Sequence, residues 1–123
     1  MRDISRNLRK ARFALSDEIK LTGTPAQVEW AERIRLTVAQ EFDRIAKAFQ
    51  AQSASQTVEK QSETRTILEI LEQKRAETMS IGIAGYFIRE WQDLSDQVRL
   101  MIAKDPRYHF IRDQRARRRG TAI

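Results

Sequence analysis

The 123-residue chain contains no cysteine and only one histidine, His109. Without cysteine there are no disulfide bonds and no thiolate metal sites, which fits a reducing compartment. No apolar run approaches the ~20 residues that span a membrane. The basic N-terminus is not followed by the apolar stretch of a secretory signal. We therefore expect a cytoplasmic protein that makes no use of a membrane.

The residues that usually carry catalysis are also scarce. A nucleophile needs a neighbouring base, most often histidine, and His109 lies in a basic stretch where a surface or phosphate-facing role is expected. No Glu-x-x-His unit, phosphate-binding glycine loop or dinucleotide fingerprint occurs. Carboxylate pairs on helical spacing, Glu29 with Glu32 and Glu69 with Glu72, are expected on solvated faces. The sequence predicts no enzyme, cofactor, metal site or small-molecule substrate.

Two prolines and four glycines leave few interruptions for helices. The clearest start signal is Thr24 as N-cap, with Pro25 at the first helical position and Gln27 at the third, which forms a capping box. Apolar residues then recur every three or four positions. We predict a helix from 25 to about 50, with a stripe of Val28, Ala31, Ile34 (or Arg35), Val38, Phe42, Ile45 and Phe49.

Residues 50–57 are small and polar and predict either a loop or a frayed end of this helix. Helicity is expected again from about Thr57. Residues 78–86 contain Gly82 and Gly85, which indicate a turn or a close approach of two helices. Asp105 and Pro106 end one helix and begin another, for which Gly120 is the expected end. A second apolar stripe precedes them: Ala84, Phe87, Ile88, Trp91, Leu94, Val98, Met101 and Ile102.

No alternating strand pattern is present. The predicted fold is all-α, a bundle of three to four helices in one domain over 1–123. We divide this domain into a basic N-terminal segment (1–20), a helical body (21–103) and a basic C-terminal arm (104–123). We predict that five aromatic residues pack in the core, namely Trp30, Phe42, Phe49, Phe87 and Trp91.

The stretch LTGTPAQVEWAERIR, residues 21–35, resembles a segment of small bacterial proteins of plasmid or phage origin. Their pattern Leu-Thr-Gly-x-x-x-Gln-x-x-Trp-Ala-Glu-x-Ile-Arg begins a long helix. A later aromatic segment in those proteins corresponds to residues 85–90 here, although several positions differ. The resemblance implies a shared helical hairpin and a mobile-element setting, and it carries no activity.

The net charge of +6 lies at the two ends of the chain. Residues 1–12 hold five basic residues and one acidic residue, and residues 104–119 hold seven basic and two acidic residues. Between them, residues 13–103 hold 11 basic and 14 acidic residues. A mildly acidic body with arginine-rich ends predicts contact with an anionic partner, because the planar guanidinium binds phosphate in a fork.

We predict two basic segments that bind nucleic acid. In the C-terminal arm, Arg112, Arg115, Arg118 and Arg119 are expected to carry most of the phosphate contact on a helix that begins at Pro106. Tyr108 and Phe110 lie among these arginines and either stack on bases or anchor the last helix to the bundle. The full set of candidate residues is Arg2, Arg6, Arg9, Lys10, Arg12, Arg107, Tyr108, Arg112, Arg115, Arg117, Arg118 and Arg119.

These features favour a non-enzymatic protein that contacts the phosphate backbone of DNA or RNA, since no motif for reading bases is present. By analogy of size, helicity and charge, it resembles the small subunits of CRISPR effector complexes. The alternative is a protein–protein module of a mobile element, an inhibitor or adaptor, whose arginines dock on an acidic protein partner.

Overall fold

The computed structural model describes residues 19–121, and five α-helices make up most of this range. Outside the helices, its only extended pairing is an isolated bridge between Thr22 and Ile83. The prediction of an all-helical fold is therefore confirmed. The helices are α2 (Pro25–Ser53), α3 (Val58–Met79), α4 (Ala84–Glu90), α5 (Leu94–Lys104) and α6 (Pro106–Thr121).

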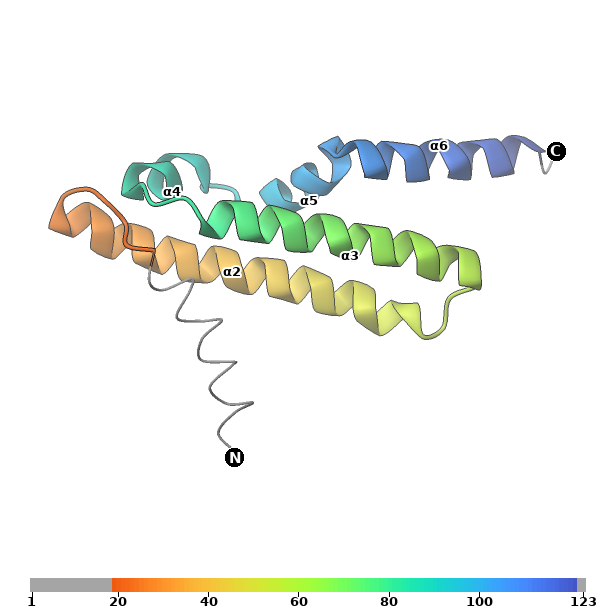
Figure 1. The fold of residues 1–123 in the computed structure, drawn as a ribbon, viewed down its shortest axis with the longest axis horizontal. Helices are drawn as coiled ribbons and strands as arrows, with labels where there is room; N and C mark the ends of the chain where they lie inside the picture. The colour runs from red at the N-terminus through yellow and green to blue at the C-terminus, as the bar shows by residue number, and fades with distance from the viewer. Residues whose placement is uncertain (1–18, 122–123) are drawn as a thin grey trace, which may run out of the picture.

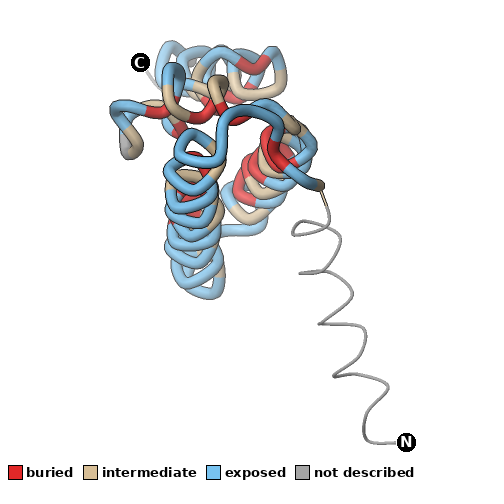
Figure 2. Tube along the Cα trace, turned by 90° about the vertical axis from the view of Figure 1, so that its left-hand side faces the viewer, coloured by how far each residue is buried: buried red, intermediate tan, exposed pale blue. Residues whose placement is uncertain are grey.

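The two long helices, α2 and α3, run antiparallel as a hairpin that closes at residues 54–57 (Figure 1). The three shorter helices follow one another along this hairpin as a second layer (Figures 1 and 2). α4 packs on α2, α5 touches both long helices, and α6 packs on α3 and α5. Buried residues gather between the layers (Figure 2). Within 19–121, no helix is both long and apolar enough to cross a membrane.

The start of α2 is built as predicted. The hydroxyl of Thr24 accepts a hydrogen bond from the backbone N–H of Gln27 at 3.2 Å, and the Gln27 side chain accepts one from the Thr24 N–H at 3.0 Å. Pro25 occupies the first turn, where no N–H partner is required. The helix continues past the predicted end at about 50 to Ser53, and Thr57 caps the next helix.

The residues before the cap attach the chain to the start of α4. The N–H of Thr22 donates to the carbonyl of Gly82 at 2.8 Å, and the N–H of Ala84 donates to the carbonyl of Thr22 at 3.0 Å. Gly23 has a φ of +152°, and a Cβ there would lie 3.2 Å from the Cβ of Ala84. A side chain at position 23 would therefore be strained in backbone and in space.

The aromatic core follows the predicted stripes in part. Phe42, Phe87 and Trp91 are buried, and the rings of Phe42 and Trp91 meet edge to face with centroids 6.0 Å apart. Phe49 is half-buried. The prediction was wrong for Trp30, which is 58% exposed. Position 30 lies about 100° around the helix from the fully buried position 31, which turns it toward the edge of the stripe.

The second apolar stripe is split into two helices. α4 ends at Glu90 and α5 begins at Leu94, with Trp91 in the connection yet 5% exposed. The indole N–H of Trp91 donates to the hydroxyl of Tyr86 at 3.1 Å, so the polar group of this buried ring has a hydrogen-bond partner.

The end of the last helix differs from the prediction. α6 passes through Gly120 to Thr121 rather than ending at the glycine.

Candidate nucleic-acid interface

The candidate interface lies on α6, and its first turn is held by Asp105. The buried carboxylate of Asp105 accepts hydrogen bonds from the backbone N–H and the Nε of Arg107, each at 2.9 Å. The Nζ of Lys74 lies 3.7 Å from Oδ2 of Asp105 and adds a second positive charge beside this carboxylate. The Arg107 side chain is the main cause that lowers the pKa of Asp105 to about 2, against the opposing effect of burial. Arg107 therefore serves the helix start.

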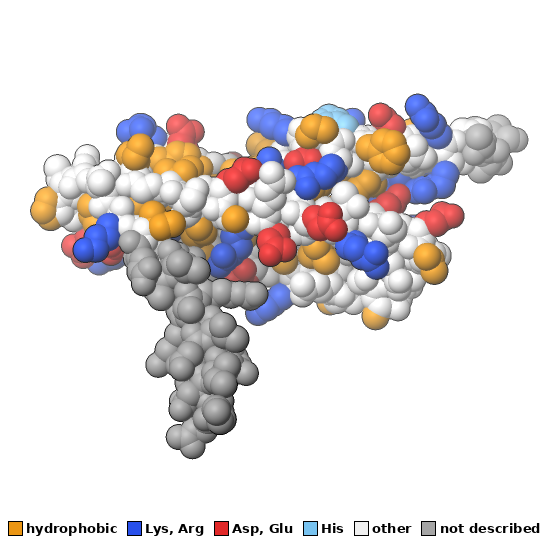
Figure 3. All heavy atoms as spheres, in the orientation of Figure 1, with side chains coloured by type: hydrophobic (Ala, Val, Ile, Leu, Met, Phe, Trp, Pro, Cys, Tyr) orange, Lys and Arg blue, Asp and Glu red, His pale blue; other side chains and the backbone are white. Residues whose placement is uncertain are grey.

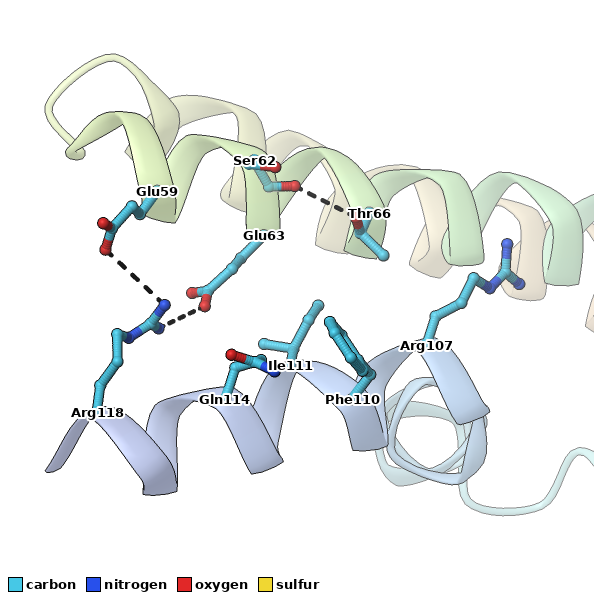
Figure 4. A pocket seen from close by; sticks show the side chains of 9 residues that line it. All are labelled: Glu59, Ser62, Glu63, Thr66, Arg107, Phe110, Ile111, Gln114 and Arg118. Carbon is cyan, nitrogen blue, oxygen red and sulfur yellow. Dashed lines mark hydrogen bonds and ion pairs between the residues drawn. The ribbon is translucent and has the colours of Figure 1, made fainter. Parts of the chain in front are cut away.

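Two further arginines of α6 bind a carboxylate of α3. The Nε of Arg115 lies 3.2 Å from Oε1 of Glu63, and the Nη2 of Arg118 lies 2.7 Å from its Oε2. Oε2 of Glu59 lies 3.8 Å from Nη1 of Arg118 (Figure 4). We call Glu59, Glu63, Arg115 and Arg118 the Glu63 cluster.

Glu63 is a nearly buried carboxylate, 9% exposed. Burial opposes its ionisation, but hydrogen bonds from Arg118 and Arg115, together with their charges, outweigh burial and lower the pKa of Glu63. The same pairing raises the pKa of Arg118. The predicted phosphate role of Arg115 and Arg118 stays a prediction. Their guanidinium groups already have a structural partner, which no local sequence signal indicated.

Other arginines of α6 do not bind Glu63. We call the exposed residues His109, Arg112, Asp113, Arg117 and Arg119 the outer face of α6. Within 19–121, Arg112 and Arg119 form no ion pair with a described residue. Arg117 is exposed as well, and Asp113 is the single acidic side chain on this helix. Figure 3 shows the surface around α6 and the charges of both signs over α3.

The two aromatic residues of the arm have different positions. Tyr108 is half-buried and packs against the core, so it anchors α6 to the bundle. Phe110 is 64% exposed. Its ring stands at the edge of a groove of about 500 Å³ between α3 and α6 (Figure 4). The sequence left both interpretations open for each ring, and the structure assigns the anchoring role to Tyr108.

The other predicted residues fall outside this helix. Arg2, Arg6, Arg9, Lys10 and Arg12 lie outside the residues that the structure describes. Of the candidate residues, the structure describes those of the C-terminal arm, and all of them lie on α6.

The carboxylate pairs do not form a metal site in the described part of the chain. Glu29 pairs with Arg33 at 3.0 Å on the surface of α2, and Glu32, Glu69 and Glu72 are exposed. Among residues 19–121, no group of three or more histidine, cysteine or acidic residues is arranged to hold a metal ion.

No protein-family model, curated protein or solved structure matches the chain. The resemblance of residues 21–35 to plasmid and phage proteins therefore stays a prediction. The Leu-Thr-Gly-Thr part of this stretch has a structural role in the protein. Backbone hydrogen bonds of Thr22, and the close contact of Gly23 with Ala84, join the start of α2 to the start of α4.

Proposed function

We propose that this protein is a non-enzymatic nucleic-acid-binding protein that contacts the phosphate backbone through the outer face of α6. The observation that carries the proposal is the pair Arg112 and Arg119, which are exposed and form no ion pair with a described residue. They are seven residues apart, so they lie on the same side of the helix, about 10 Å apart along its axis.

The chemistry of this face suits a polyanion. A guanidinium group binds phosphate through two parallel hydrogen bonds, and it keeps its charge at every physiological pH. Phosphate contacts orient a protein on nucleic acid without reading bases. Binding through this face is therefore expected to depend on salt and to vary little with sequence.

A small helix face of this kind gives weak binding by itself. We further propose that the protein is a small subunit of a nucleoprotein complex. Other subunits of that complex would supply the remaining contacts to nucleic acid. The basic residues before position 19 would add to the same attraction, because they carry the same sign of charge.

The test uses the double variant Arg112→Ala/Arg119→Ala, which leaves the Glu63 cluster intact. Purified parent and variant are titrated with unrelated duplex DNA and single-stranded RNA over a salt series. We expect the variant to bind every sequence more weakly. On duplex DNA, its salt slope should fall by up to about 1.8, since each lost phosphate contact removes about 0.9.

A matched control removes the same charge elsewhere. Arg65 and Arg89 are exposed arginines of α3 and α4 that form no ion pair with a described residue. The variant Arg65→Ala/Arg89→Ala should bind nearly as the parent does. Equal losses in the two double variants would show that only net charge matters, and absence of binding by the parent at low salt would overturn the proposal.

A further inference from the structure

A second groove lies on the side of the molecule where α2, α5 and α6 meet. It has a volume of about 460 Å³. Most of its lining is apolar: Ile45, Ala48 and Phe49 come from α2, Ile102 and Ala103 from α5, and Tyr108 from α6. An apolar cavity of this size is sufficient to bury several side chains of a ligand.

Two arginines stand beside this apolar surface, Arg44 from α2 and Arg99 from α5. Both are exposed, and no acidic residue lines the groove. The nearby carboxylate of Glu41 is buried and already held by Arg44, at 2.8 and 2.7 Å. From Arg44 to its end at Ser53, α2 carries Arg44 and Lys47 and no acidic residue. The groove is therefore apolar inside and positive at its rim.

The composition of the lining argues against a nucleobase. Bases carry polar edges that need hydrogen-bond partners when they are buried. In this groove most of the lining groups are aliphatic or aromatic carbon atoms. Such a surface suits leucine, isoleucine or phenylalanine side chains of a protein.

The wall from α2 also has the period of a helix. Ile45, Ala48, Phe49 and Gln52 follow i, i+3, i+4 and i+7, which makes one ridge along the groove. A helix packs on such a ridge by placing its own apolar residues between these side chains. Acidic residues at the edge of that helix would then meet Arg44 and Arg99.

We propose that the groove between α2, α5 and α6 binds an acidic amphipathic helix of a partner protein. Apolar residues of the partner, spaced three and four apart, fill the groove. Its carboxylates pair with Arg99 and, beside Glu41, with Arg44. This interaction uses a different surface from the outer face of α6, so it does not depend on nucleic-acid binding.

The test is a display selection of random 16-residue peptides on the folded full chain. The variant Ala48→Trp fills the groove, and Ala76→Trp is the matched control, since Ala76 is an exposed alanine of α3 that does not line it. We expect enriched peptides to combine apolar residues at helical spacing with aspartate or glutamate. Once synthesised, they should bind Ala48→Trp at least tenfold more weakly than the parent or Ala76→Trp.

Charge is tested separately, and this variant serves if Ala48→Trp fails to fold. Arg99→Glu should weaken the same peptides at least fivefold. Arg65→Glu makes an equal change in charge on α3 and should have a smaller effect. Failure to enrich any peptide, enrichment of basic peptides, or peptide binding that neither groove variant weakens would overturn the proposal. A loss of oligonucleotide binding by the groove variants, without peptide binding, would assign the groove to nucleic acid instead.

Discussion

The core around α2 and α4 and the attachment of α6 are held by different forces. In this core, Phe42 of α2 and Phe87 of α4 are at most 1% exposed and contribute by burial of apolar surface. In α6, Ile111 is the one buried hydrophobic residue among those described. Half-buried Tyr108 packs on the core, Glu63 of α3 binds Arg115 and Arg118, and Lys74 of α3 lies 3.7 Å from Asp105, the residue before α6.

This difference has physical consequences. Burial of apolar surface responds little to pH, whereas ion pairs weaken as salt screens them and as their carboxylates are protonated. The attachment of α6 should therefore respond to pH and salt under conditions where the core remains folded. The helix that carries the candidate interface is also the one whose attachment depends most on charge.

The largest effect is expected in the core. Phe42→Ala and Trp91→Ala should each lower the free energy of unfolding by about 3–5 kcal/mol, because each leaves a cavity among buried side chains. Urea denaturation measures this change. Leu36→Ala is the control, since Leu36 is 61% exposed. A loss below about 1 kcal/mol in the core variants would show that burial does not hold this end of the molecule.

The next effect concerns acid. The pKa of Asp105 is lowered from 3.8 to about 2, so its ionised form stabilises the folded state at higher pH. This contribution is complete above about pH 4 and is lost as the pH falls toward 2. We expect a loss of about 1–2 kcal/mol over that range. In Asp105→Asn this step should disappear, whereas Asp113→Asn, at an exposed position of α6, should keep it.

A smaller effect is expected for the Glu63 cluster. Glu63→Gln removes the charge that binds Arg115 and Arg118, at a cost of about 1 kcal/mol, because both arginines can turn to water. Hydrogen exchange should show the loss mainly in the amides of α6, and less of it in high salt. Glu72→Gln on the exposed side of α3 is the control. Equal protection of α6 in both variants would contradict a role for this cluster.

Local patterns predicted much of the fold. The capping box at Thr24, the return of helix near Thr57 and the helix start at Pro106 depend on neighbouring residues, which the sequence displays directly. The split between α4 and α5 was missed, because Trp91 is placed by contacts with Phe42 and Tyr86 rather than by helical period. In the candidate site, the partner of Arg115 is 52 residues away, so only the folded chain brings them together.

The smallest effect on stability is expected for the outer face of α6, and it separates the two kinds of arginine on this helix. Arg112 and Arg119 are exposed and form no ion pair with a described residue. Exposed residues without such partners usually change stability by less than about 0.5 kcal/mol. Arg112→Ala/Arg119→Ala should therefore unfold in urea as the parent does, with unchanged hydrogen exchange in α6.

This null result on stability matters because the same variant is expected to lose affinity for nucleic acid. If removal of these arginines leaves stability unchanged but weakens phosphate binding, their effect comes from direct contact with the nucleic acid. If instead the variant loses more than about 1 kcal/mol, these arginines stabilise α6 as Arg115 and Arg118 do. Weaker binding would then follow from a displaced helix, and the outer face would have no separate role.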